Sequence, residues 1–293
     1  IRDSSWIDIS TGSFYISSIK PERLASELTR LSPSEILLSE SLAKAHRDLA
    51  EEFGISVTEL GNSAFDSSSA RERLKKTFNV ETVDGLGNFN RAELSSMGAI
   101  IEYLQITQKG KLPLLSRPRR ELNSSFMTID TATRKNLELT KGLSSGNKFG
   151  SLLSVIDHTL TSGWARLLEK RVSAPSTNLA EIEKTLNGLD FMIADADLSS
   201  SLRSELRKVP DLDRALSRVS LGRAGPRDLV SIRNGLLQSS IISKMLSSFA
   251  LPKLIEEKLA IFPEQDVQMQ IDEAIENATM GMIPEKDVKN KNY

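Results

Sequence analysis

Three carboxylates in the first quarter of the chain have the side-chain type that metal-dependent chemistry needs. Asp8 lies in an alternating apolar run, and Glu35 and Asp66 lie at the starts of later segments. Three converging acids could hold two divalent cations and support phosphodiester hydrolysis. Because their spacing does not force them together, we interpret Asp8 as a turn-edge residue and the others as helix caps or surface charges.

The other candidate groups are two histidines and one glycine-containing loop. His46 and His158 have no second His, Cys or clustered carboxylate at metal-ligand spacing, so we expect structural or surface roles. The loop from Gly142 to Lys148 is one residue short for a phosphate-binding loop, and Phe149 stands where a Ser or Thr should bind magnesium. We therefore predict no catalytic, cofactor-binding or metal-binding residue in this chain.

Composition restricts the function classes further. Lys and Arg total 38 against 39 Asp and Glu, and the net charge of −1 predicts weak affinity of this chain alone for DNA. The absence of Cys excludes disulfides and thiolate sites, and fits a cytoplasmic location. No apolar run reaches the roughly 20 residues that span a bilayer, and no signal peptide follows Ile1. Since the chain begins without Met, we expect a piece of a longer protein.

The first 117 residues show strand and helix patterns in alternation, which predicts an α/β domain with helices covering a sheet. We expect the opening hairpin, which turns at Thr11-Gly12, to belong to that sheet. A basic segment with Gly and Pro, from Lys109 to Arg120, is interpreted as a solvated linker, with a phosphate-facing patch as the alternative. The predicted strands are 5–10, 13–19, 35–39 and 55–60, and the predicted helices begin at Pro21, Ser41, Asp66 and Ala92.

The remaining chain is predicted to be a helical bundle over residues 118–278, with a frayed tail at 279–293. The change of class falls at Phe126 to Leu139, where Asp130 has the residue type and position of a helix N-cap. Apolar residues from Leu152 to Val172 recur at helical spacing and should bury one side. One predicted helix ends near Asp157. Others start near Ser162, Asn178, Asp211 and Pro226, and two later ones cover about 254–262 and 267–278.

Several blocks in this order resemble the MutS family of DNA mismatch-repair proteins. The junction reads Ile-Asp-Thr-Ala-Thr-Arg-Lys-Asn-Leu-Glu-Leu over 129–139, which is similar to the family's connector–lever junction. Asp8 to Phe14 resembles the connector hairpin, and Ser154 to Leu168 resembles a lever block. Another block consists of 211–214 followed by 224–229. The sequence departs from the family at Trp164, where Gly is usual, and at Arg171-Val172, where Trp-Leu is common.

The resemblance implies an RNase H-like connector followed by the first part of the α-helical lever. In such proteins the connector docks MutL, and the lever transmits conformational change. The longer protein would bind mismatched double-stranded DNA as a homodimer and hydrolyse ATP with Mg²⁺. The mismatch-recognition, clamp and ATPase domains would lie outside this chain, so we expect it to be no enzyme and to hold no cofactor. Phe262-Pro263-Glu264 fits the family's Phe-x-Glu mismatch wedge, but its position favours a helix end.

Two alternatives of other classes stay open from the residues. One is an independent helical adaptor that binds proteins and has no part in repair, and the other is an RNase H-type nuclease built around Asp8. A lever that is cut within its helices should also leave an apolar strip exposed, which favours self-association.

Overall fold

The structure is a computed structural model, and it describes residues 3–110, 112–122 and 125–260. The chain divides into two compact units. The first contains residues 1–157 and 168–177, and the second contains 158–167 and 178–293. Strands and helices mix in the first unit, and the described part of the second is helical, which confirms a change from α/β to helical structure. No described helix is long and apolar enough to cross a membrane.

The described strands of the first unit form two small sheets. Strands β1 (Asp3–Asp8) and β2 (Ser13–Ser18) make the predicted antiparallel hairpin, and β2 pairs in parallel with β5 (Arg119–Arg120). Strands β3 (Glu35–Ser39) and β4 (Ser56–Leu60) form a separate parallel pair. The expectation of one sheet that includes the hairpin is therefore wrong for the described strands, because β5 occupies the second edge of β2.

The segment predicted to be a solvated linker is instead built into the hairpin sheet. Ser116 donates its amide to the Gly12 carbonyl at 2.8 Å, and its hydroxyl accepts the Phe14 amide at 3.1 Å. The Glu121 amide donates to the Ile16 carbonyl at 2.8 Å. Gly12 has a φ of +71°, and a Cβ there would lie 1.8 Å from the Leu114 carbonyl oxygen. Only glycine fits this close approach without a backbone shift.

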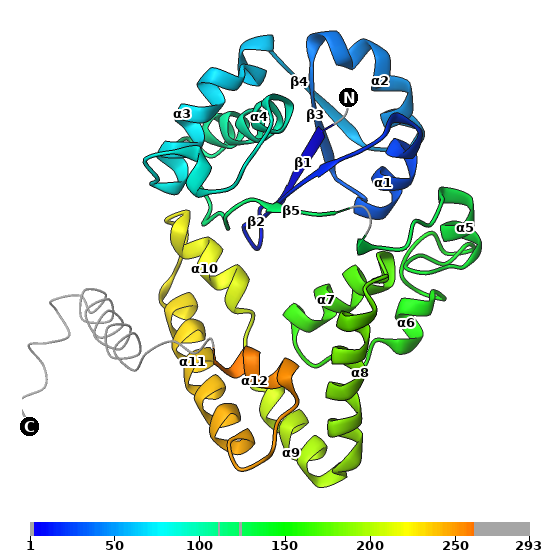
Figure 1. Cartoon of the computed structure of the whole chain (residues 1–293), viewed down its shortest axis with the longest axis vertical. Coiled ribbons are helices and arrows are strands. Elements are labelled where there is room, and N and C mark those ends of the chain that lie inside the picture. Colours follow the sequence, from blue (N-terminus) through cyan, green and yellow to red (C-terminus); the bar gives the residue numbers. More distant parts are fainter. Residues whose placement is uncertain (1–2, 111, 123–124, 261–293) are drawn as a thin grey trace, which may run out of the picture. The chain divides into compact units, whose positions relative to one another are not determined.

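Helices and the hairpin enclose the core of the first unit. Its fully buried side chains include Phe14, Ile16, Leu74, Met97 and Ile101. Figure 1 shows α3 and α4 side by side. The helices of this unit are α1 (Leu24–Leu31), α2 (Glu40–Glu52), α3 (Ser67–Phe78), α4 (Arg91–Thr107), α5 (Thr131–Asn136) and α6 (Leu152–Ile156).

Side-chain caps fix several helix starts. Asp66 accepts the Ser69 amide at 2.8 Å, and Asp130 accepts the Thr133 amide at 2.9 Å. The Ser69 amide lowers the pKa of Asp66. The Thr133 hydroxyl, and after it the Thr133 amide, lowers the pKa of Asp130, because these hydrogen bonds stabilise the charged carboxylates. The start of α4 has a full capping box, with Asn90 and Glu93 bonding each other's backbone amides. Sequence reasoning predicted the two Asp caps and missed this box.

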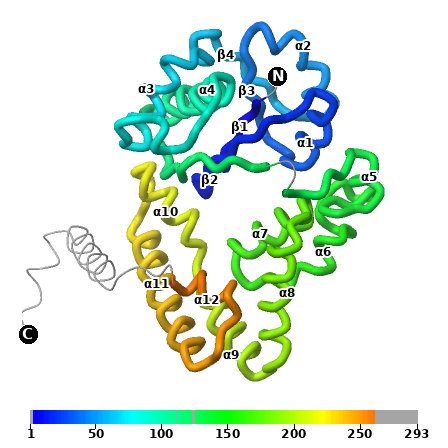
Figure 2. The backbone as a smooth tube through the Cα atoms, viewed as in Figure 1, coloured from blue at the N-terminus to red at the C-terminus, as the bar shows by residue number. Residues whose placement is uncertain are grey.

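The second unit packs helices against one another (Figure 2). Helices α10 and α11 lie side by side, and α8 contacts both α9 and α12. Helix α9 was not predicted, although Asp195 caps it by accepting the Leu198 amide at 2.8 Å. The predicted helix at 267–278 and the tail at 279–293 lie outside the described residues. The helices are α7 (Ser162–Ser173, shared with the first unit), α8 (Leu179–Ala194), α9 (Ala196–Leu206), α10 (Leu212–Ser220), α11 (Pro226–Leu246) and α12 (Lys253–Leu259).

Many predicted core positions in the helical half are exposed. Leu153 is fully buried, but Ile156 is 40% exposed and Trp164 is 55% exposed, so the predicted buried side of residues 152–172 is wrong at those positions. Helix α8 carries an exposed apolar strip, and its most exposed members are Leu179, Leu186, Leu189 and Ile193. Periodicity identified the helices, but it could not identify what covers their apolar faces.

Candidate functional site

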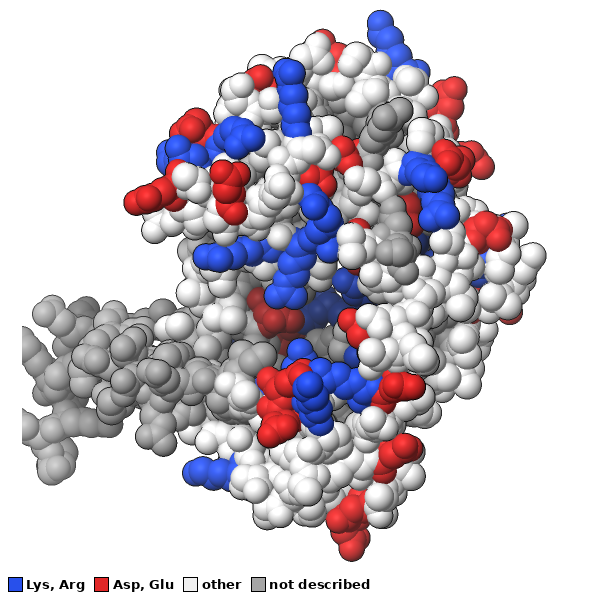
Figure 3. Space-filling view, viewed as in Figure 1, with Lys and Arg blue, Asp and Glu red and all other residues white. Residues whose placement is uncertain are grey.

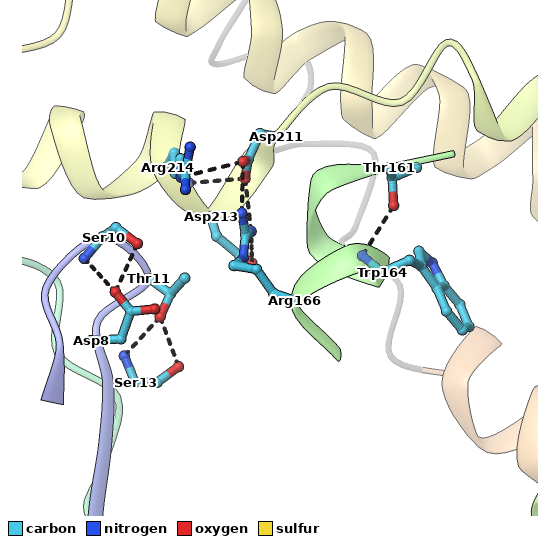
Figure 4. Close-up of polar contacts among 10 residues, drawn as sticks. All are labelled: Asp8, Ser10, Thr11, Ser13, Thr161, Trp164, Arg166, Asp211, Asp213 and Arg214. Carbon is cyan, nitrogen blue, oxygen red and sulfur yellow. Dashed lines mark hydrogen bonds and ion pairs between the residues drawn. The ribbon is translucent and has the colours of Figure 1, made fainter. Parts of the chain in front are cut away.

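The three acids considered for a nuclease centre have separate local roles. Asp8 lies in the hairpin turn, where one carboxylate oxygen accepts the Ser10 amide at 2.8 Å and hydroxyl at 2.7 Å (Figure 4). Glu35 accepts the Tyr103 hydroxyl at 2.8 Å, which raises the pKa of that phenol. Asp66 caps α3. No group of three metal-ligating side chains occurs among the described residues, and the nuclease alternative has no geometric support.

The glycine-containing loop uses its amides for its own turns. The Gly142 amide donates to the Asn147 carbonyl at 2.8 Å, and the Phe149 amide donates to the Asn147 side chain at 2.9 Å. Lys148 pairs with Asp157. Because these two amides donate within the loop, they do not point outward to bind a phosphate, as they would in a phosphate-binding loop.

Among the residues that the structure describes, neither histidine belongs to a group of metal-ligating side chains. His46 is half-buried on α2. His158 is exposed, and its backbone carbonyl accepts a hydrogen bond from Arg203 at 3.3 Å.

The basic segment contains one arginine that is held by an intramolecular partner. Arg120 donates to Glu93 at 2.7 Å and to the Asn88 carbonyl at 2.8 Å, and its guanidinium lies 5.7 Å from the Phe89 ring. Figure 3 shows basic and acidic side chains interspersed on the face drawn. These observations give little support to a dedicated phosphate-binding patch, although Arg117 and Arg119 are exposed.

A cluster of charges, which we call the junction cluster, holds the start of the helical region within the first unit. Its members are Glu27, Arg30, Glu121 and Lys170. Glu121 has a side chain only 8% exposed, and it accepts from Arg30 at 2.7 Å and from Lys170 at 3.4 Å. Arg30 also pairs with Glu27 at 2.7 Å. Buried pairing of this kind fixes position, because removing one partner leaves an uncompensated charge.

Two stacked aromatic rings extend the junction cluster onto the hairpin sheet. The ring centroids of Trp6 and Tyr15 lie 5.7 Å apart. Arg30 lies 5.6 Å from the Trp6 ring, and the Lys170 Nζ atom lies 4.0 Å from the Tyr15 ring. Both are cation–π geometries. Lys170 on α7 is thus held by β2 as well as by Glu121.

A second cluster, the lever cluster, lies in the second unit and comprises Arg166, Asp211, Asp213 and Arg214 (Figure 4). Arg166 donates two hydrogen bonds to Asp211, at 2.8 and 2.9 Å, and one to Asp213 at 3.0 Å. This two-pronged geometry suits a guanidinium and a carboxylate. The hydrogen bonds from Arg166 lower the pKa of Asp211 and raise that of Arg166.

Asp211 also caps α10, since it accepts the Arg214 amide at 3.4 Å. The lever cluster therefore joins the sequence block that contains Arg166 to the block that begins at Asp211. Sequence reasoning identified both blocks separately, and only the structure shows that they are paired.

Helix α7 belongs to both units. Its residues through Leu167 lie in the second unit and those from Leu168 in the first. Arg166 is fixed in the lever cluster, and Lys170, one turn further along, is fixed in the junction cluster. No sequence motif predicts the contact between Lys170 and Glu121, because the two residues lie far apart in sequence and neither belongs to a cap or turn signature.

Comparisons with known proteins give one consistent family. The model of MutS domain II matches residues 4–116, and the model of MutS domain III matches residues 132–290. The DNA mismatch repair protein MutS of Roseobacter denitrificans is 51% identical over 262 residues, which cover 88% of this chain and 30% of that protein. The MutS protein of Ruegeria pomeroyi is 52% identical over 252 residues, covering 86% and 29%, respectively.

The MutS protein of Paracoccus denitrificans is 49% identical over 260 residues, which cover 87% of this chain and 29% of that protein. The chain spans about 30% of the length of the curated relatives it matches. The domain II match ends at residue 116, and the domain III match begins at residue 132, within the predicted junction at Phe126 to Leu139, in the order that the sequence blocks predicted. The chain belongs to the MutS family.

Proposed function

We propose that this chain is the connector and the first part of the lever of a mismatch-repair protein, and that it couples partner docking to conformational change. On this proposal residues 1–117 form an RNase H-like connector, residues 118–278 form the lever, and 279–293 form a tail. The observation that carries the proposal is the ordered match of domain II and domain III on either side of one junction.

Helix α7 supports the mechanical part of this proposal. A helix with intact backbone hydrogen bonds moves as a stiff element over a few turns. Arg166 and Lys170 lie one turn apart on α7, and each is held by charges of a different unit. A displacement at one cluster would therefore reach the other through a single turn of helix.

The longer protein would bind mismatched double-stranded DNA as a homodimer in the cytoplasm and hydrolyse ATP with Mg²⁺. The chain itself would do neither, and its own partner would be MutL, bound through the first unit. An ATPase assay of the purified chain, with and without mismatched DNA, should give no turnover above buffer. Turnover that copurifies with the chain through two different columns would contradict this division of roles.

Calorimetric titration of the 293-residue chain with the cognate MutL amino-terminal domain tests docking. We expect saturable binding. The matched variants are Phe14→Asp, which places an unpaired charge in the core of the first unit, and Ile232→Asp, which does the same in the second.

Binding should disappear in Phe14→Asp and persist in Ile232→Asp, with circular dichroism reporting the structure that remains. Failure of the folded wild-type chain to bind, or binding that survives Phe14→Asp, would contradict docking through the first unit.

A further inference from the structure

A small cavity lies in the first unit beside the junction cluster. It has a volume of about 20 Å³ and is lined by residues of η1 (Pro21–Arg23) and α1, by Glu121, by residues 126–129 and by Arg134 of α5. Arg30, Glu121 and Arg134 are among its walls. Space of this size holds one or two particles as large as a water molecule. The cavity is therefore large enough for a water molecule or a monatomic ion, but it is too small for a larger polyatomic ligand.

Among the residues that line this cavity, Arg134 is unusual because it is buried with unpaired hydrogen-bond donors. The residue is only 6% exposed, and its Nε and Nη1 atoms are buried without a hydrogen-bond partner among the described residues. A guanidinium keeps its charge in proteins and has five N–H donors. Buried polar atoms are almost always paired, so these two donors require a partner that the described residues do not supply.

The nearby carboxylates are already occupied. Glu27 pairs with Arg30, and Glu121 pairs with both Arg30 and Lys170. Arg30, Lys170 and Arg134 therefore share two carboxylates in this region, and Arg23 also lines the cavity, so positive charges outnumber negative ones among the described residues there. Burial lowers the pKa of Arg134, and the charge on Arg30 lowers it further, while Glu27 partly opposes the shift. The region favours a negative occupant.

A water molecule could accept hydrogen bonds from Arg134, but it would leave the excess charge in place. An uncompensated buried charge is strongly destabilising. We infer that the cavity binds one monovalent anion the size of chloride, with the Arg134 guanidinium as its principal donor. The anion completes the charge balance of the junction cluster, where α1 and α5 meet. This inference does not depend on the proposed function.

Binding can be measured directly on the 293-residue chain. Chloride-35 NMR linewidths should broaden on adding the protein to NaCl, and the excess broadening should be displaced saturably by bromide. Thermal unfolding at constant ionic strength, with gluconate as the replacement anion, should show a stabilisation by chloride that grows with the logarithm of chloride concentration above the dissociation constant. At ten times the dissociation constant the folding equilibrium constant should rise by about 11-fold.

Arg134→Met tests the residue, and Arg71→Met, an exposed arginine on α3, removes one charge without touching the cavity. Excess broadening and chloride-dependent stabilisation should vanish in Arg134→Met and persist in Arg71→Met. Without chloride, Arg134→Met should be at least as stable as wild type, because it removes a buried unpaired charge.

The linewidth measurement on the wild-type chain tests the inference even if Arg134→Met fails to fold. Absence of displaceable broadening in the wild type would show that the cavity holds only water. Equal broadening in Arg134→Met would show that the anion lies elsewhere. Saturable binding of phosphate without binding of chloride would contradict a chloride-sized site. Each of these results would overturn the inference.

Discussion

The lever cluster gives a prediction whose size follows from its geometry. Replacing Arg166 with Gln removes two hydrogen bonds to Asp211 and one to Asp213. Hydrogen bonds to charged groups contribute about 1.5–3 kcal/mol, and fully exposed ion pairs about 0.2–1 kcal/mol. The side chains of Arg166 and Asp211 are 25% and 20% exposed, so their pair belongs near the lower end of the first range. Asp213 is 57% exposed and adds little.

We therefore expect Arg166→Gln to destabilise the second unit by about 2 kcal/mol. In a double-mutant cycle with Asp211→Asn, the coupling energy should be about 1.5 kcal/mol, which is a little over tenfold in an equilibrium constant. Asn is chosen because it keeps a side-chain oxygen for the α10 cap. Hydrogen exchange read by mass spectrometry on peptides from α7 and α10 reports the local opening free energy without assuming that both units unfold together.

The same variants predict a pH dependence. The folded-state pKa of Asp211 is lowered chiefly by Arg166. A lowered carboxyl pKa gives stability that is present above the unfolded pKa of about 3.9 and is lost as pH falls through the folded value. The difference between wild type and Arg166→Gln should thus be constant from about pH 7 to 5 and shrink below about pH 4. A coupling below about 0.3 kcal/mol at pH 7, or a difference that grows in acid, would refute the reasoning.

Three further changes test packing. Gly12→Ala should lower the free energy of unfolding, measured in urea, by at least about 3 kcal/mol, because φ is +71° and the new Cβ would meet the Leu114 carbonyl. A near-neutral result would mean that the segment after α4 is not held there. Gly98→Ala should lower the free energy of unfolding by about 1–2 kcal/mol, since the new Cβ would lie 2.3 Å from the Cβ of Ala70. An increase in stability would contradict the α3–α4 contact. The wild-type chain should self-associate through α8 in sedimentation velocity, and Leu189→Glu with Ile193→Glu should weaken this; a strictly monomeric profile at high concentration would count against it.

Local chemistry made much of the helical organisation predictable. Asp66, Asp130 and Asp211 act as caps because each carboxylate bonds an amide three residues away, an interaction that lies within a short window of sequence. Pro226 begins α11 for the same kind of local reason. The family resemblance rests on blocks that include two of these caps.

Features that depend on distant partners were not predictable from local patterns. Strand β5 consists of two arginines and has no apolar alternation, so only its pairing with β2 defines it. The contact between Arg30 and Glu121 joins residues 91 positions apart. Arg134 lies in a helical, polar context that suggests exposure, yet tertiary packing buries it. Tertiary burial decides the role of such residues, and periodicity carries no information about it.

On the proposed function, α7 transmits conformational change between the two units. The most direct measurement is hydrogen exchange of α10 peptides with and without saturating MutL amino-terminal domain. We compare the wild-type chain with a Leu167→Gly, Glu169→Gly variant, which weakens α7 by about 1 kcal/mol at each of two exposed positions. The matched control is Leu167→Ala, Glu169→Ala, which keeps the helix.

We expect MutL to change α10 exchange in the wild type and in the alanine control. The glycine variant should still bind MutL but lose the change. An α10 response that is absent in the wild type, or unchanged in the glycine variant, would contradict transmission through α7.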